Sequence, residues 1–180
     1  MRLFIGLTVP EEIQQTLRQA WHEASVNPVG LATKRSSLWH VTLAFLDDVP
    51  EEQLETLRHL VEAAAAHPPG GAFVIDRFEA FPRRKPTRIV ARATPEHLKK
   101  WTECVNSLRD MLSILAPKID RKPWQPHISI TRNEKRTFLE PWSESFSPVY
   151  WTPMTVAILK SVPGPTGSSY QILYEFPCGT

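Results

Sequence analysis

Two of the six histidines in this 180-residue chain share one local pattern, a histidine followed two positions later by a hydroxyl residue. The pattern is His40-x-Thr42 in the first half of the chain and His127-x-Ser129 in the second, each with apolar residues interleaved. Side chains alternate across a β-strand, so each segment presents an imidazole and a hydroxyl on one face. The repetition favours a pair of matched functional sites over two ordinary strand histidines.

This pair of side chains suits a reaction that forms one P–O bond while another breaks. One imidazole accepts a proton and the other donates one, and an ordinary histidine pKa of about 6.5 makes both forms available near neutral pH. The hydroxyls of Thr42 and Ser129 can donate hydrogen bonds to the non-bridging phosphate oxygens. His40 and His127 are therefore predicted as catalytic residues, and the chemistry requires neither a metal nor another cofactor.

The composition indicates an ordinary globular chain with a local site. A length of 180 residues predicts one domain, or at most two closely joined lobes. Apolar residues make up 42% and charged residues 22%, which excludes wholesale disorder, collagen and coiled coil. The net charge of +2 is too small for general attraction to nucleic acid or membranes, so anion binding must be local.

The sequence also predicts the cellular compartment of the protein. Cys104 and Cys178 lie far apart and form no CxxC pair, which argues against a disulfide framework or a thiolate zinc site. No apolar run approaches the roughly 20 residues that a membrane-spanning helix needs. The apolar opening segment is interpreted as a first strand and not as a signal peptide. A cytoplasmic protein with reduced thiols is expected.

The helices and strands that position the histidines are predicted from the spacing of apolar residues and from prolines followed by acidic residues. Helices are predicted after the prolines at positions 10, 50 and 95, because proline followed by acidic residues is typical of a helix N-terminus. Strands are predicted over residues 3–8, 38–46, 73–81, 88–93, 125–131, 154–159 and 170–176. The Pro/Gly-rich break at residues 67–71 is the best boundary between two halves.

The chain resembles the 2H phosphoesterases, and among them the RNA 2′,3′-cyclic phosphodiesterases that are also called 2′-5′ RNA ligases. The resemblance spans most of the chain and rests on residues 2–6, 40–46, 81–82 and 126–132, in matching order and spacing. The sequence departs from the common pattern at Ser129 in place of Thr, Asp47 in place of Gly and Trp124 in place of Phe. Serine keeps the hydroxyl, while the other two changes bear on loop shape and substrate preference.

The resemblance implies an α+β, bilobal fold over residues 1–180. Two pseudo-symmetric lobes of mostly antiparallel sheet carry helices on their outer faces, and each lobe contributes one His-x-[Ser/Thr] strand to a central cleft. It also implies metal-independent hydrolysis of a 2′,3′-cyclic phosphate, at an RNA end or on a small cyclic nucleotide, to a 2′-phosphate. The reverse reaction would join RNA ends through a 2′-5′ linkage.

The resemblance further implies individual roles. His127 would be the general base on water and His40 the general acid to the departing 3′ oxygen, an order that the residues alone do not determine. Arg132 matches a phosphate-binding position, although strict strand alternation would turn it away from His127 unless the strand bends by Thr131. Phe4 is a candidate for base stacking. The protein is expected to act as a monomer.

Two alternatives come from other functional classes. One is a non-catalytic module that binds RNA ends, and the other is a metallohydrolase with His40 and His127 as ligands, although no carboxylate accompanies them at a fitting spacing. Two basic clusters, over residues 83–88 and 118–122, would either contact RNA or simply keep the surface soluble.

Overall fold

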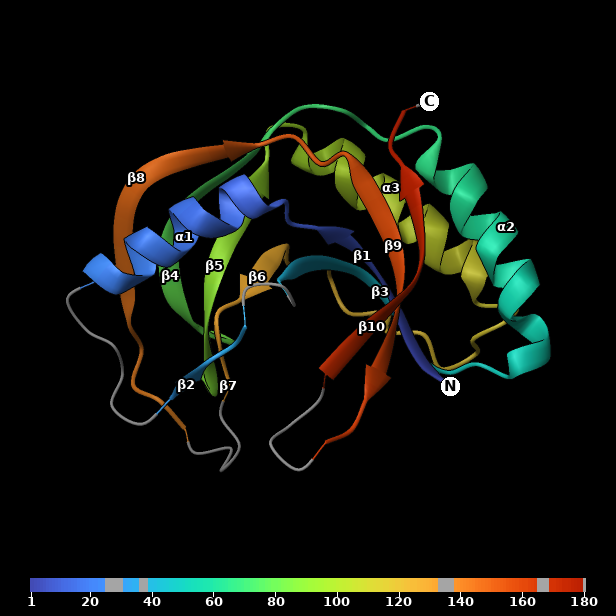
Figure 1. Ribbon diagram of the computed structural model, residues 1–180, viewed down its shortest axis with the longest axis horizontal. Helices are drawn as coiled ribbons and strands as arrows, with labels where there is room; N and C mark the ends of the chain where they lie inside the picture. Colours follow the sequence, from blue (N-terminus) through green and yellow to red (C-terminus); the bar gives the residue numbers. More distant parts are fainter. Residues whose placement is uncertain (25–30, 36–38, 133–137, 165–168, 180) are drawn as a thin grey trace.

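A computed structural model describes residues 1–24, 31–35, 39–132, 138–164 and 169–179. Within these ranges the chain is an α+β fold, in which three α-helices pack on an eight-stranded antiparallel sheet (Figure 1). The helices are α1 (Glu11–Glu23), α2 (Leu54–Ala65) and α3 (Leu98–Leu112). The strands are β1 (Arg2–Thr8), β2 (Ala32–Thr33), β3 (His40–Asp48), β4 (Phe73–Phe81), β5 (Arg88–Pro95), β6 (His127–Ser129), β7 (Thr131–Arg132), β8 (Ser143–Trp151), β9 (Thr155–Val162) and β10 (Ser169–Pro177).

The large sheet has its two histidine strands at the centre. Its order is β10-β9-β1-β3-β6-β5-β4-β8, and every neighbouring pair is antiparallel. The strands on the β3 side come from the beginning and end of the chain, whereas those on the β6 side come from the middle. The predicted fold class is thus confirmed, and the assignment of two lobes to the single domain of residues 1–180 stays a prediction.

The helices cover the two halves of the sheet from one side. Helix α1 contacts β8, α2 contacts β9 and β10, and α3 contacts β3 and β5, an arrangement that Figure 1 shows with α1 apart from the α2–α3 pair. Acidic residues in the first turn of α1 oppose the helix dipole, and an apolar stripe that includes Leu17 and Trp21 is buried. Within the described ranges, none of the helices is long and apolar enough to cross a membrane.

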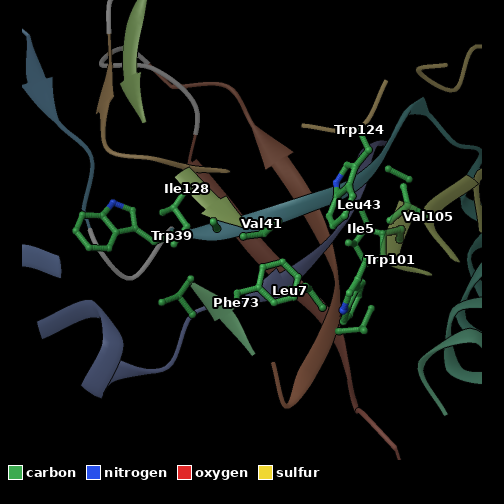
Figure 2. Close-up of a cluster of buried hydrophobic side chains, with 14 of the residues drawn as sticks. Ile5, Leu7, Trp39, Val41, Leu43, Phe73, Trp101, Val105, Trp124 and Ile128 are labelled. Carbon is green, nitrogen blue, oxygen red and sulfur yellow. The ribbon is translucent and has the colours of Figure 1, made fainter. Parts of the chain in front are cut away.

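The core lies between the sheet and the helices. Figure 2 shows Val41 of β3 and Ile128 of β6 next to one another in this core, with Trp101 and Trp124 farther along it. Val41 and Ile128 are fully buried, and Trp101 retains 3% of its exposure. Trp101 therefore belongs to the buried face of α3.

Three features differ from the sequence prediction. The predicted strand over residues 125–131 is split, because β6 ends at Ser129 and β7 leaves the sheet to pair with β2. Strand β8 was not expected, since it is polar and contains Pro148, but it lies at the sheet edge, where a proline removes no ladder hydrogen bond. Helix α1 ends at Glu23, a few residues before the predicted end near residues 27–28.

Candidate active site

The register between β3 and β6 brings the two histidines onto one face of the sheet. Val41 pairs with Ile128 in the antiparallel ladder, and both side chains point into the core. Because side chains alternate along each strand, His40 and His127 project from the opposite face. His40 precedes Val41 and His127 precedes Ile128 on antiparallel strands. The two histidines therefore lie on opposite sides of the Val41–Ile128 pair and are diagonal neighbours. The two imidazoles predicted to converge thus come from adjacent strands.

The two predicted phosphate-binding hydroxyls occupy the other diagonal of the same strand pair. Extending the register by one residue each way places Ser129 opposite His40 and Thr42 opposite His127. Both hydroxyl residues are half-buried. Each imidazole thus has a hydroxyl directly across the ladder, and the four side chains share one face of the strand pair.

His40 is held in an aromatic niche beside β1. Its ring centroid lies 4.8 Å from that of Phe4 and 5.2 Å from that of Tyr170, which meets it edge-on. Gly6 leaves the space that the His40 ring occupies: a Cβ atom there would lie 3.4 Å from His40 Cδ2 and 3.2 Å from the Val41 carbonyl oxygen. Tyr170 was not identified from the sequence, because its place beside His40 depends on the pairing of the final strands.

Phe4, predicted as a base-stacking residue, is 3% exposed. Its ring packs on those of His40, Phe45 and Tyr170, which leaves little free surface for a base. Phe45, its partner in the β1–β3 ladder, is 53% exposed. Stacking by Phe4 stays a prediction, and it requires a neighbouring side chain to move aside.

The hydrogen bond of His127 defines which of its ring nitrogens carries a proton. Its Nδ1 lies 2.7 Å from the backbone oxygen of Gln125. A carbonyl oxygen only accepts hydrogen bonds, so Nδ1 must carry the donated proton, and in the neutral ring Nε2 then has a free lone pair. The ring of Phe81 packs against the imidazole at a centroid distance of 4.4 Å. This is the tautomer that a general base needs.

The surroundings of His127 also keep it neutral. Burial is the largest cause that lowers its pKa, from 6.5 to about 4, and the positive charges of Arg88, Arg92 and Lys34 lower it further. The hydrogen bond to Gln125 acts in the opposite direction. At pH 7 the ring is therefore unprotonated and able to accept a proton.

A buried arginine and a tryptophan tie the segment before β6 to β3. Trp124 Nε1 donates to the Thr42 carbonyl oxygen at 2.8 Å. Arg109 of α3 donates to the carbonyl oxygens of Leu43, at 3.0 Å, and Lys122, at 2.8 Å. Arg109 was not predicted from the sequence, although a charged residue next to Leu108 on the apolar stripe of α3 was a usable signal.

Arg132, the third predicted phosphate-binding residue, belongs to β7, where its backbone pairs with Ala32. The break after Ser129 supplies the bend that its proposed role requires. The side chain of Arg132 lies outside the described part of the structure, so its contact with phosphate stays a prediction.

Two hollows flank the histidine pair on this face. The first, here called the β1–β10 hollow, has a volume of about 400 Å³ and is lined by residues that include Phe4, Phe45, Arg88, Lys118 and Tyr170. The second, here called the β4–β5 hollow, has a volume of about 800 Å³ and includes Phe81, Arg83, Arg92, Gln125 and Trp142. Each predicted basic cluster thus contributes at least one side chain to a hollow beside the site.

The described residues contain no group of three or more His, Cys, Asp or Glu side chains placed to hold a metal ion. His40 and His127 therefore have no carboxylate or thiolate companions, within the described ranges, that would complete a metal site.

Comparisons with known proteins agree with this geometry. Residues 7–91, which contain the first histidine motif, match the model of the LigT like phosphoesterases. An RNA 2′,3′-cyclic phosphodiesterase of Thermotoga maritima is 26% identical over 181 residues, covering 97% of this chain and 94% of that protein. An enzyme of the same name from Geobacillus stearothermophilus is 27% identical over 129 residues, which cover 72% of this chain and 41% of that protein.

Solved structures show the same fold over nearly the whole chain. The protein TT0787 of Thermus thermophilus superposes with a TM-score of 0.82 at 26% identity, covering 99% of this chain and 98% of that one. LigT of E. coli, in its apo form, gives a TM-score of 0.75 at 20% identity with the same coverage. The family-model match over residues 7–91 and the curated relatives thus make this chain similar to the LigT like phosphoesterases and support a phosphodiesterase of the hydrolase class.

Proposed function

We propose that this chain hydrolyses 2′,3′-cyclic phosphates, at RNA ends or on small nucleotides, and leaves a 2′-phosphate. The observation that carries the proposal is the diagonal placement of His40 and His127 on one sheet face, with the Nε2 lone pair of His127 available. The names of the curated relatives support the same reaction. LigT of E. coli has been crystallised with 3′-AMP, which agrees with a nucleotide ligand.

In the proposed mechanism, the cyclic phosphate lies between the two imidazoles. His127 Nε2 takes a proton from a water molecule whose oxygen forms a new bond to phosphorus. The bond from phosphorus to the 3′ oxygen breaks, and His40 gives that oxygen a proton. The proton thus enters on the His127 side and leaves on the His40 side, as in-line displacement requires.

The remaining predicted site residues bind the phosphate and the base. Thr42 and Ser129 donate hydrogen bonds to the non-bridging oxygens, and Arg132 adds a planar set of donors for the same group. Phe4 contributes to the wall that the base of the reacting nucleotide contacts. Placing the 3′ oxygen on the His40 side puts this nucleotide in or near the β1–β10 hollow.

The same groups would also act with an alcohol as the nucleophile, with His127 as the base and His40 as the acid in unchanged roles. A 5′-hydroxyl in place of water then gives a 2′-5′ linkage between RNA ends. We propose that the protein works as a monomer in the cytoplasm, where its two free thiols, Cys104 and Cys178, stay reduced.

The decisive experiment uses an oligoribonucleotide that ends in a 2′,3′-cyclic phosphate. Wild type should open the ring in the presence of EDTA, while His40→Ala and His127→Ala should each lose about 10²-fold or more of kcat, the usual contribution of an acid–base group. His67→Ala, which changes an exposed histidine away from the site, is the matched control.

The outcomes separate the possible functions. Binding of the RNA end without turnover by wild type would identify a binding module instead. Loss of activity in EDTA with recovery on adding a divalent metal would identify a metal-dependent hydrolase. Equal rates for wild type and both histidine variants would exclude the proposed mechanism.

A further inference from the structure

The β4–β5 hollow is unexplained by a reaction that needs only water beside His127. Its volume of about 800 Å³ is within the usual range for small-molecule sites. The half-buried rings of Phe81 and Trp142 line it together with the polar groups of Gln125, Thr94 and Ser143. Aromatic faces combined with amide and hydroxyl groups suit a nucleoside, because bases stack on aromatic rings whatever their sequence.

The charge of the hollow suits an anion. Three arginines line it, and two of them are paired with acids, Arg92 with Glu79 at 2.7 Å and Arg77 with Asp76 at 3.0 Å. Arg83 is exposed and forms no ion pair with any acid in the described residues. It therefore leaves the hollow with an uncompensated positive charge, as a phosphodiester-binding site requires.

The β4–β5 hollow lies on the His127 side of the histidine pair. The sheet order places His40 on β3, His127 on β6, and the lining residues beyond His127 on β5, β4 and β8. The hollow adjoins His127 directly, because Phe81 packs on its ring and the backbone oxygen of Gln125 accepts a hydrogen bond from its Nδ1. In an in-line displacement the nucleophile approaches from the side of the general base, which is the side of this hollow.

We infer that the β4–β5 hollow is an acceptor subsite, which binds a nucleotide with a free hydroxyl group so that this hydroxyl replaces water as the nucleophile. The inference rests on the proposed function and assigns a location to the second substrate. Trp142 and Phe81 would contact the base, and Arg83 the phosphodiester. The occupancy of the hollow would then decide between hydrolysis and transfer.

The transfer step balances without an additional reactant. The acceptor hydroxyl oxygen forms a bond to phosphorus and gives its proton to His127 Nε2. The bond from phosphorus to the 3′ oxygen breaks, and that oxygen takes the proton of His40. The product is a phosphodiester between the 2′ oxygen of the donor and the acceptor, with no other cosubstrate consumed.

The test supplies a donor RNA that ends in a 2′,3′-cyclic phosphate together with a rising concentration of ApA, a dinucleoside monophosphate with a free 5′-hydroxyl. Mass spectrometry separates donor plus water from donor plus acceptor. With wild type the transfer product should rise and saturate. Arg83→Glu should lower the ratio of transfer to hydrolysis about tenfold, and Thr94→Trp, which fills the hollow, should do the same.

Arg84→Glu is the matched control, because Arg84 is also exposed and adjacent in sequence but does not line the hollow, and it should keep the wild-type ratio. Circular dichroism establishes that each variant is folded. Hydrolysis without transfer at saturating ApA, or a ratio unaltered by both hollow variants, would disprove the acceptor subsite and leave the proposed function standing. A donor that wild type does not consume at all would disprove both.

Discussion

His40 and His127 lie across a diagonal of the strand pair at the centre of the sheet, because the pair between them, Val41 and Ile128, points into the core. Diagonal neighbours on antiparallel strands are typically about 7–8 Å apart, which leaves room for a tetrahedral phosphate between two side chains. The separation of the two imidazoles is therefore set by the ladder and not by the closure of a loop.

The hydroxyls on the other diagonal should contribute to rate. Thr42→Val and Ser129→Ala each remove one donor to a charged phosphate, so kcat/KM for a cyclic phosphate should fall about tenfold or more. Thr42→Ser and Ser129→Thr keep the hydroxyl and should stay within about threefold of wild type. Steady-state kinetics on the four variants test this, and equal losses for the hydroxyl-keeping pair would mean that only packing was disturbed.

Gly6→Ala should impair His40 without a change at His40 itself. The added methyl group would press on the Val41 carbonyl oxygen and on the His40 ring, so kcat should fall about tenfold while KM changes less. Val61→Ala destabilises the buried face of α2 away from the site and serves as the control. A kcat loss in both variants, in proportion to their thermal destabilisation, would contradict a local effect.

The low pKa of His127 predicts activity well into the acid range. Its neutral form persists down to pH values near 4, so the acid limb of kcat/KM should lie close to pH 4 and not near 6.5. A profile measured from about pH 3.5 to 8 on a cyclic mononucleotide tests this. A limb near pH 6.5 would show that the ring titrates like an exposed histidine.

The same group should make stability depend on pH. Between pH 6.5 and 4 the unfolded chain binds a proton at His127 that the folded chain does not, so the free energy of unfolding rises with pH over this interval. The contribution is fully present above pH 6.5 and is lost as pH falls towards 4. Urea unfolding at about pH 4.5 and about pH 7 should give a larger difference for wild type than for His127→Gln.

Arg109 should matter for stability more than a surface arginine does. Arg109→Met leaves the carbonyl oxygens of Leu43 and Lys122 without their donor, which should lower the free energy of unfolding by about 2–4 kcal/mol. Arg121→Met removes an exposed ion pair with Asp110 and should cost less than about 1 kcal/mol. Similar losses for the two variants in urea unfolding would contradict a central role for Arg109.

Much of the fold was predictable because its determinants are local. Proline and acidic residues marked the start of the helices, and alternation or β-branched runs marked β1, β3, β4, β5, β9 and β10. Strand β8 escaped prediction because its central Pro148 is typical of a loop, and only its edge position makes it acceptable. The break between β6 and β7 depends on the pairing of β7 with β2, which the local sequence does not predict.

The candidate site was predictable in its residue types but not in its geometry. The repeated motif identified His40 and His127, whereas their adjacency depends on the pairing of segments that lie far apart in the chain. The tautomer of His127 depends on a backbone oxygen of Gln125, for which side-chain identity carries no signal. Arg83 was predicted only as part of a basic cluster. That Arg83 lines a hollow while its neighbour Arg84 does not is determined by the fold.

The order in which a ribosome delivers the strands has a consequence for when the site is assembled. Strands β4, β5, β6 and β8 are all synthesised by Trp151, so the His127 half of the sheet can pair while the chain is still being made. The partner of the outer edge of β1 is β9, which follows these strands in the chain, and Tyr170, which packs on His40, follows β9. The strands around His127 can therefore pair before the aromatic niche of His40 is complete.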